Sequence, residues 1–182
     1  MVKQKNVLVV QGGVSSEREI SLRSGKACIR ALKKLKHKVI TFDPAKENLN
    51  KIKRYKNKVD LIFNALHGKD GEDGIAQSYF EYLRIPYTHS GVLSSYNAMN
   101  KLISKEIFKK NRINTPEYFV LKKKDFNQIK LNALLKRKKI KFPIVVKPIN
   151  EGSSIGVKIC KDIYNLNKNS KYVLLLNNDT YI

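Results

Sequence analysis

Short runs that are apolar at every position constrain this chain most, because each ends in a turn or a polar loop. Such a run suits a strand buried on both faces of a parallel sheet, whereas a half-exposed strand would alternate. The segments between them have helical character. We expect strands at 6–11, 39–42, 59–64 and 85–87, and helices at 16–35, 47–56 and 75–84. This β-α-β-α-β-α-β order predicts an α/β domain with a doubly wound parallel sheet.

The first predicted helix has a recognisable start. Ser16 and Glu19 have the spacing of a capping box, with Ser16 at the N-cap and Glu19 at N3. The apolar residues that recur at helical spacing are expected to face the core. They are Ile20, Ala27, Ala31 and Leu35.

The pattern changes near residue 98, which divides the chain into predicted domains at 1–97 and 98–182. Helical signals extend over 92–110 and end at Asn111. A Gly/Ser-rich loop at 150–156 joins two apolar runs, which predicts an antiparallel hairpin. The second domain is therefore α+β. Its further expected elements are strands at 118–121, 142–148 and 157–160, and a helix that Asp125 caps and that ends near 138.

The charge is large but diffuse. The 182 residues include 37 Lys and Arg against 15 Asp and Glu, a net charge of +22, and lysine supplies 30 of the 37 basic residues. Sequence-specific DNA readers depend on bidentate arginine, so we interpret the lysine runs as solvated faces rather than a polyanion-binding patch. Two cysteines exclude a disulfide scaffold, and no apolar run reaches the ~18 residues of a membrane helix. We expect a cytoplasmic protein with no nucleic-acid or membrane partner.

Two polar loops follow predicted strands, where open α/β sheets bind ligands. Loop one, residues 12–17, lacks the G-x-G-x-x-G spacing of dinucleotide sites. Its Glu17 either complements the helix dipole or holds a cationic ligand group. Loop two, residues 67–74, places His67 among three glycines and three carboxylates. Ile75 stands where an EF-hand needs glycine, so we expect a different kind of ligand site there.

Loop three, residues 151–156, has the composition of a phosphate-binding loop but is not a Walker A motif. Its glycines free backbone N–H groups to face phosphate oxygens, and Ser153 and Ser154 add hydroxyl donors. Lys147 follows three apolar residues on the preceding strand. Its ammonium either meets an anion or extends to water.

Together these segments resemble the D-alanine–D-alanine ligases of the ATP-grasp superfamily, in the family's order and spacing, over about residues 6–161. The matching stretches are 12–25, 65–74, 85–91, 99–101, 146–148 and 151–156. The resemblance implies a Rossmann-like pre-ATP-grasp domain followed by part of an ATP-grasp central subdomain. It implies that ATP phosphorylates one D-alanine, whose acyl phosphate the amine of a second D-alanine attacks, giving D-alanyl-D-alanine for peptidoglycan.

The resemblance also implies residue roles. Glu17 would hold the ammonium group of the first D-alanine, and His67 would lie by the substrate carboxylate. Lys101 and Lys147 would neutralise ATP phosphates. Ser153, with Ser154, would close over the γ-phosphate, so Glu17 and Ser153 are the candidate catalytic residues. ATP and Mg²⁺ (or Mn²⁺) are the implied cofactors.

Three departures from the family pattern stand out. Asn100 replaces the usual Asp, and His89 the usual Gly. The family also continues beyond residue 182 with an adenine-contacting strand, a lid loop and the metal-ligating carboxylates. We therefore expect the 182-residue chain to be inactive alone. The alternative is a non-catalytic or split-subunit binding module. The implied partners are D-alanine and ATP, with a homodimer or a separate C-terminal chain.

Overall fold

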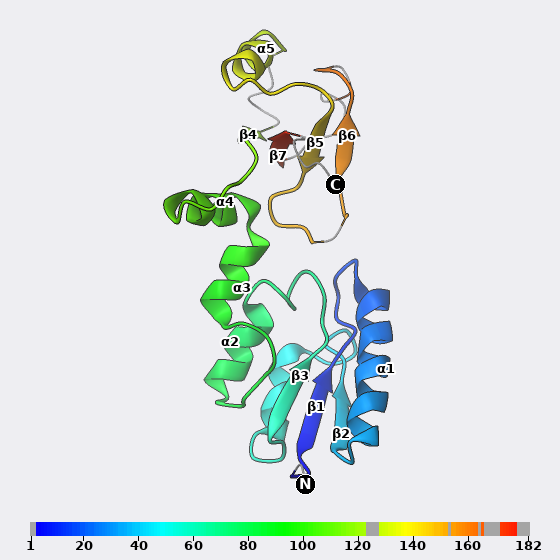
Figure 1. The fold of residues 1–182 in the computed structure, drawn as a ribbon. Coiled ribbons are helices and arrows are strands. Elements are labelled where there is room, and N and C mark those ends of the chain that lie inside the picture. The colour runs from blue at the N-terminus through cyan, green and yellow to red at the C-terminus, as the bar shows by residue number, and fades with distance from the viewer. Residues whose placement is uncertain (1–2, 123–127, 153, 164, 166–171, 178–182) are drawn as a thin grey trace. The chain divides into compact units, whose positions relative to one another are not determined.

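The computed structural model describes residues 3–122, 128–152, 154–163, 165 and 172–177. The chain divides into two compact units, Met1–Asn97 and Ala98–Ile182 (Figure 1). In the described parts of the chain, no helix combines the length and the apolar character needed to cross a membrane.

The first unit is built on a three-stranded parallel sheet. Strand β1 (Asn6–Val10) lies between β2 (Lys38–Phe42) and β3 (Leu61–Asn64). The strand expected at 85–87 is wrong, because only an isolated parallel bridge joins Tyr87 to Ile62. Pro86 has no N–H group to donate to a ladder, which limits pairing at this edge.

Helices cover both faces of this sheet, as the uniformly apolar strands predict (Figure 1). On one face, Ile29 and Leu32 of α1 (Arg18–Lys34) pack against Val7 and Val9 of β1. The opposite face is covered by the 3₁₀ helix η1 (Leu49–Tyr55) and by α2 (Ile75–Tyr82). They lie within the predicted helices 47–56 and 75–84, of which the first is 3₁₀ and the second is confirmed. The fully buried core on that face includes Leu8, Val10, Ile52, Ile62 and Phe80.

Helix α1 corrects two expectations. Its N-cap is Glu17, without a side-chain capping bond, so the Ser16–Glu19 capping box is wrong. Its buried face carries Ser21 and Gly25 instead of the predicted apolar residues. Ser21 Oγ donates to the Ala65 carbonyl and accepts from Gly12 N, and these bonds offset the cost of burying the hydroxyl. The four residues expected in the core are exposed: Ile20, Ala27, Ala31 and Leu35.

The helix predicted over 92–110 is two helices, α3 (Val92–Met99) and α4 (Lys101–Lys110). Asn100 separates them because its side chain accepts hydrogen bonds from the backbone N–H groups of Leu102 and Ile103. Those N–H groups belong to the first turn of α4 and have no intrahelical acceptor, so Asn100 is an N-cap. The predicted end of the helix at Asn111 is confirmed.

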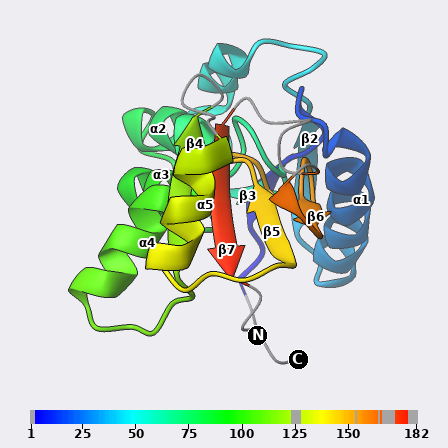
Figure 2. The same cartoon turned by 90° about the horizontal axis from the view of Figure 1, so that it is seen from above.

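The second unit contains a four-stranded antiparallel sheet in the order β4-β7-β5-β6 (Figure 2). The predicted hairpin is confirmed, with β5 paired to β6. The sequence did not predict β7, which lies between β4 and β5. Leu131 and Leu135 of α5 pack in a core with Ile144. Asp125 lies outside the described residues. The element bounds are Tyr118–Lys122 (β4), Gln128–Arg137 (α5), Ile144–Lys147 (β5), Lys158–Cys160 (β6) and Tyr172–Asn177 (β7).

Candidate functional site

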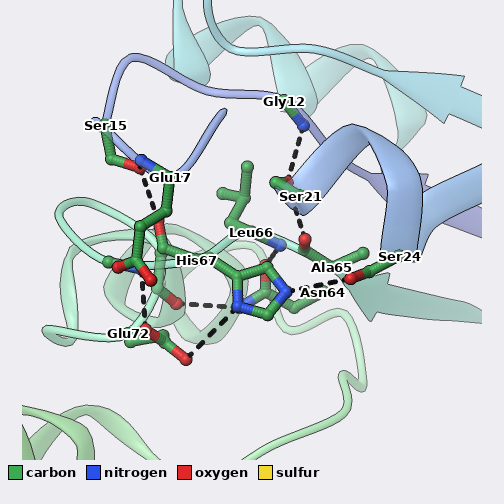
Figure 3. Close-up of polar contacts among 12 residues, drawn as sticks. Gly12, Ser15, Glu17, Ser21, Ser24, Asn64, Ala65, Leu66, His67 and Glu72 are labelled. Carbon is green, nitrogen blue, oxygen red and sulfur yellow. Dashed lines mark hydrogen bonds and ion pairs between the residues drawn. The ribbon is translucent and has the colours of Figure 1, made fainter. Parts of the chain in front are cut away.

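Loop one brings Glu17 to the point where α1 begins. The Ser15 hydroxyl fixes the approach, since it accepts from Glu17 N at 3.2 Å and donates to the His67 carbonyl at 2.7 Å. One hydroxyl therefore ties loop one to loop two. Figure 3 shows the side chains of Glu17, His67 and Glu72 gathered where these loops meet.

The Glu17 carboxylate is buried, and one of its oxygens has no partner among the described residues. Only 7% of the residue is exposed, and the unpartnered oxygen is Oε2. It lies close to Gly68, where an added Cβ would come within 2.6 Å of Oε2. A buried carboxylate without a partner costs several kcal/mol, roughly, unless a cation or donor reaches it. The site is therefore suited to a small cationic group.

The His67 ring lies between helix α1 and the carboxylate of Glu72 in loop two. Its Nε2 lies 3.2 Å from Ser24 Oγ on α1, and its Nδ1 lies 4.0 Å from Glu72 Oε1. The ring is about one-third exposed, so a ligand can reach it. Glu72 is otherwise anchored, because its Oε2 accepts from Gly68 N at 2.6 Å. Protonated His67 would gain an ion pair with Glu72, whereas neutral His67 keeps one nitrogen as an acceptor.

The carboxylate of Asp73, also in loop two, binds backbone groups. Asp73 accepts hydrogen bonds from the N–H groups of Asp70 and Ile75, at 2.9 and 3.2 Å. The second bond caps α2, whose N-cap residue is Gly74 with φ +96°. Gly71 is enclosed, since an added Cβ would lie 2.4 Å from Leu66 Cβ. The shape of loop two thus depends on these backbone contacts, which leaves His67 and Glu72 to face Glu17.

A cavity of about 250 Å³ lies against loops one and two at the carboxyl ends of the strands. Its volume is sufficient for a small molecule of a few heavy atoms. It combines apolar walls with a few polar groups, which is the composition of most ligand pockets. The lining residues include Gly13, Leu49, Leu66, His67, Lys69 and Tyr79.

In the second unit, lysines gather around the start of α4 and the end of β5. Lys101 N donates to the Ile149 carbonyl at 3.0 Å, and Lys101 Nζ donates to the Glu151 carbonyl. Burial lowers the pKa of Lys101, and the positive charge of Lys147 lowers it further. Lys105 is buried as well, and the same two causes lower its pKa. Like charges held this close favour a bound anion, because an anion relieves their repulsion.

Loop three follows this lysine group along the chain. The Gly156 backbone has φ +67°, and an added Cβ there would lie 2.6 Å from Pro148 Cγ. Glycine is therefore required for the loop to turn back into β6. Ser154 is exposed and free of side-chain contacts that fix its hydroxyl among the described residues. Ser153 lies outside the described residues.

The described residues hold no cluster of three or more His, Cys, Asp or Glu side chains that could bind a metal ion. Among these described side chains, no group therefore fits a Mg²⁺ or Mn²⁺ site.

Several residues at these sites were not assigned roles from the sequence. Ser15, Ser24 and Glu72 lie within the quoted loop motifs, but their partners come from other elements. Lys105 follows Lys101 by four residues, which places both on one helix face, and this spacing was the available signal.

Two family models match the chain. Residues 44–90 match "D-ala D-ala ligase N-terminus", and residues 107–182 match "D-ala D-ala ligase C-terminus". Curated relatives agree with both. The D-alanine--D-alanine ligase of Pelagibacter ubique is 51% identical over 169 residues, which cover 92% of this chain and 53% of the relative. The enzyme of that name from Wolbachia pipientis wMel is 44% identical over 171 residues, which cover 92% of this chain and 51% of the relative. The chain spans about half the length of these relatives.

Solved structures give the same result for the fold. The D-alanine--D-alanine ligase of Bacillus anthracis superposes with a TM-score of 0.79 at 37% identity, over 97% of this chain and 57% of that one. A structure of that ligase complexed with ATP superposes with a TM-score of 0.78 at 34% identity, over 100% of this chain and 58% of that one.

Proposed function

Because this chain belongs to the D-alanine–D-alanine ligase family, we propose that it supplies the amino-acid-binding and part of the ATP-binding machinery for ATP-dependent formation of D-alanyl-D-alanine. The product serves peptidoglycan synthesis. The fold agrees with this assignment, since a Rossmann-like pre-ATP-grasp unit is followed by part of an ATP-grasp central subdomain. We propose domain limits at 1–97 and 98–182, where the two compact units divide.

The single observation that carries the proposal is the buried, unpartnered Oε2 of Glu17. The ammonium group of D-alanine is a cation of the right size to pair with it, and a charge-assisted hydrogen bond would offset the cost of burial. His67 is proposed to lie beside the substrate carboxylate, because its partly exposed ring can donate a hydrogen bond while Ser24 holds the other nitrogen. A zwitterion would then be bound at both ends.

For ATP, we propose that Lys101 and Lys147 neutralise phosphate charge. The support is the charge of Lys147, which lowers the pKa of Lys101, together with the absence of a salt bridge from a carboxylate to either ammonium among the described residues. Ser153 and Ser154 are proposed to donate to the γ-phosphate from loop three. Phosphoryl transfer depends mainly on positioning and charge neutralisation, which are the tasks that lysines and backbone N–H groups perform.

Ligand-observed NMR with D-alanine tests the Glu17 assignment. Glu17→Gln removes the charge while keeping the shape, and it should weaken D-alanine binding by about tenfold or more, as expected for a lost charge-assisted bond. Glu19→Gln is the matched control, because Glu19 is exposed in the first turn of the same helix. Equal affinities for the two variants would contradict the proposal.

Calorimetric titration with ATP tests the lysine assignment. Lys147→Met should reduce ATP affinity by about tenfold, since a phosphate loses one of its cations. Lys158→Met, at an exposed position of strand β6, removes the same charge outside the proposed site and should leave the ATP affinity unchanged. A loss of affinity in both variants would indicate a general charge effect and would contradict a specific site.

A second copy of the chain is the proposed partner, in the cytoplasm where ATP is supplied. Five large side chains on α2 and α3 are exposed, namely Ile75, Tyr79, Tyr82, Leu93 and Tyr96. Light scattering should report a dimer, and Leu93→Asp should produce monomers. Association only with a separate chain that completes the catalytic centre would favour the split-subunit alternative.

A further inference from the structure

Arg18 and Asp43 form a bidentate ion pair at the base of loop one. Arg18 Nη1 lies 2.9 Å from Asp43 Oδ1, and Nη2 lies 2.7 Å from Oδ2. The pair joins the first residue of α1 to the residue that directly follows β2. Two parallel bonds of this kind fix orientation as well as distance, which a single lysine–carboxylate contact would not.

The same two side chains also hold the backbone of loop one. Arg18 Nη1 donates to the Gly13 carbonyl at 2.8 Å, and Gly13 N donates to Asp43 Oδ1 at 3.1 Å. Gly12 is packed against the pair, because an added Cβ would lie 2.5 Å from Asp43 Oδ1. Gly12 and Gly13 have φ of +84° and +78°, a conformation that glycine adopts readily and other residues rarely adopt. Both peptide groups of the turn are therefore fixed by side chains from other segments.

The surroundings favour the charged forms of both residues. The Arg18 guanidinium, with the N–H groups of Ala45 and Gly13, lowers the pKa of Asp43 to about 2. The side chains are 31% and 12% exposed for Arg18 and Asp43, so solvent screens the pair only in part. A contact of this kind stays formed throughout the neutral pH range.

We propose that Arg18 and Asp43 are positioning residues that set loop one so that the Glu17 carboxylate faces the substrate ammonium group. The inference rests on the proposed function, since Glu17 is the residue positioned. Glu17 precedes Arg18 directly and is the N-cap of α1. Any rotation of the start of α1 would therefore move the Glu17 side chain, and Arg18 opposes that rotation through three hydrogen bonds.

The chain contains a matched control for this pair. Glu47 and Arg54 form a second bidentate ion pair in the same unit, at 2.5 and 2.7 Å, and neither side chain makes a hydrogen bond or ion pair with the described residues of loop one or loop two. Glu47→Gln therefore removes an equivalent ion pair without disturbing Glu17. Comparing the two pairs separates positioning from the general effect of losing an ion pair.

The experiment measures D-alanine and ATP dissociation constants for the parent chain, Asp43→Asn, Arg18→Lys and Glu47→Gln. Asp43→Asn and Arg18→Lys should weaken D-alanine binding by about tenfold, since small displacements of a positioned group reduce function strongly. The ATP dissociation constant of these two variants should change less than about twofold. Glu47→Gln should have the same dissociation constants for both ligands as the parent chain. A purely structural role would weaken the binding of both ligands and lower the thermal stability. The diagnostic result is therefore weaker binding of D-alanine with unchanged binding of ATP.

Two outcomes would overturn the inference in distinguishable ways. If the parent binds D-alanine and Asp43→Asn binds it equally well, the positioning role is wrong while the proposed function stands. If the parent itself does not bind D-alanine, the proposed function fails and the inference falls with it. Should Asp43→Asn fail to fold, Arg18→Lys, which keeps the positive charge, carries the same comparison.

Discussion

Asn64 and Gln77 donate hydrogen bonds to a single acceptor, the carbonyl oxygen of Gly71, at 2.9 and 2.8 Å. Asn64 ends β3 and Gln77 belongs to α2, so the sheet and the helix hold the middle of loop two from both sides. Both side chains are almost fully buried. Asn64 also accepts from Leu66 N at 3.2 Å, whereas Gln77 Oε1 has no partner among the described residues.

This asymmetry predicts different costs of substitution. Asn64→Ala removes two buried hydrogen bonds and leaves Leu66 N without its acceptor, which should cost about 2–4 kcal/mol. Gln77→Met preserves the side-chain length, loses one hydrogen bond and removes an unpartnered oxygen, so it should cost about 1 kcal/mol. Urea unfolding of both variants measures the difference. A larger loss for Gln77→Met than for Asn64→Ala would refute this account of the network.

His89 occupies a conformation that favours glycine, with φ +85°. His89→Gly should remove this strain and stabilise the protein by about 0.5–1 kcal/mol, after allowing for the greater freedom of glycine in the unfolded chain. Its side chain is exposed, and its described contact is one with Thr88 Oγ1 at 3.2 Å. Ser90→Gly is the control, because no positive φ occurs at that exposed residue. Thermal unfolding should show a higher melting temperature for His89→Gly alone.

Acid should weaken the ion pair of Asp43. Its folded pKa of about 2 lies below the ordinary 3.8, so Asp43 adds stability that is fully present above about pH 5. That contribution is lost as the pH falls through 3.8 toward 2. The free-energy difference between the parent and Asp43→Asn should therefore shrink as the pH decreases from about 5 to 3. Urea unfolding across this range provides the measurement, and a constant difference would contradict the assignment.

Gly25 lies in the middle of α1, where alanine would ordinarily be favoured by about 1 kcal/mol. An added Cβ, however, would lie 2.7 Å from Gln11 Cβ and 2.1 Å from Gln11 Oε1. Gly25→Ala should therefore destabilise the protein by about 1–3 kcal/mol. Lys26→Ala, at the next, exposed position, should change stability by less than about 0.5 kcal/mol. A gain in stability for Gly25→Ala would mean that α1 can move away from β1 easily.

Lys147→Met should raise the pKa of Lys101. Burial is the main cause that lowers this pKa from 10.5, and the charge of Lys147 is the second. Removing that charge leaves burial, which the negative charge of Glu151 opposes. NMR titration of the Lys101 side-chain carbon next to the ammonium group measures the shift. Lys158→Met should produce no change, and an unaltered Lys101 pKa in Lys147→Met would show that the two ammonium groups are not coupled.

Local sequence signals correctly predicted the elements that depend on local or repeated patterns. The uniformly apolar strands and their alternation with helices predicted a doubly wound sheet, because burial on both faces requires apolar side chains throughout. Glycines and polar residues after these strands predicted loops one and two. Asn111 ended its helix as expected. The hairpin of β5 and β6 followed from two apolar runs around a Gly/Ser-rich loop.

The errors occurred where a partner distant in the sequence decides the outcome. The apolar periodicity of α1 indicated Leu35 and Ile20 as core residues, but Ser21 and Gly25 face the sheet. Close approach to β1 requires a small residue at 25, and the Ala65 carbonyl and Gly12 N satisfy Ser21. Similarly, Asn100 interrupts a continuous helical pattern because its side chain competes for backbone N–H groups.

The sequence by itself determined the family, the alternation of strands and helices, and the polar loops that follow the strands. Only the tertiary structure decided which charges remain unpaired. Glu17 could have been a surface carboxylate at a helix start, but loop two covers it and leaves Oε2 without a partner among the described residues. The physical reason is that burial and hydrogen bonding depend on segments far apart in the chain, whereas strand and helix patterns depend on neighbouring residues.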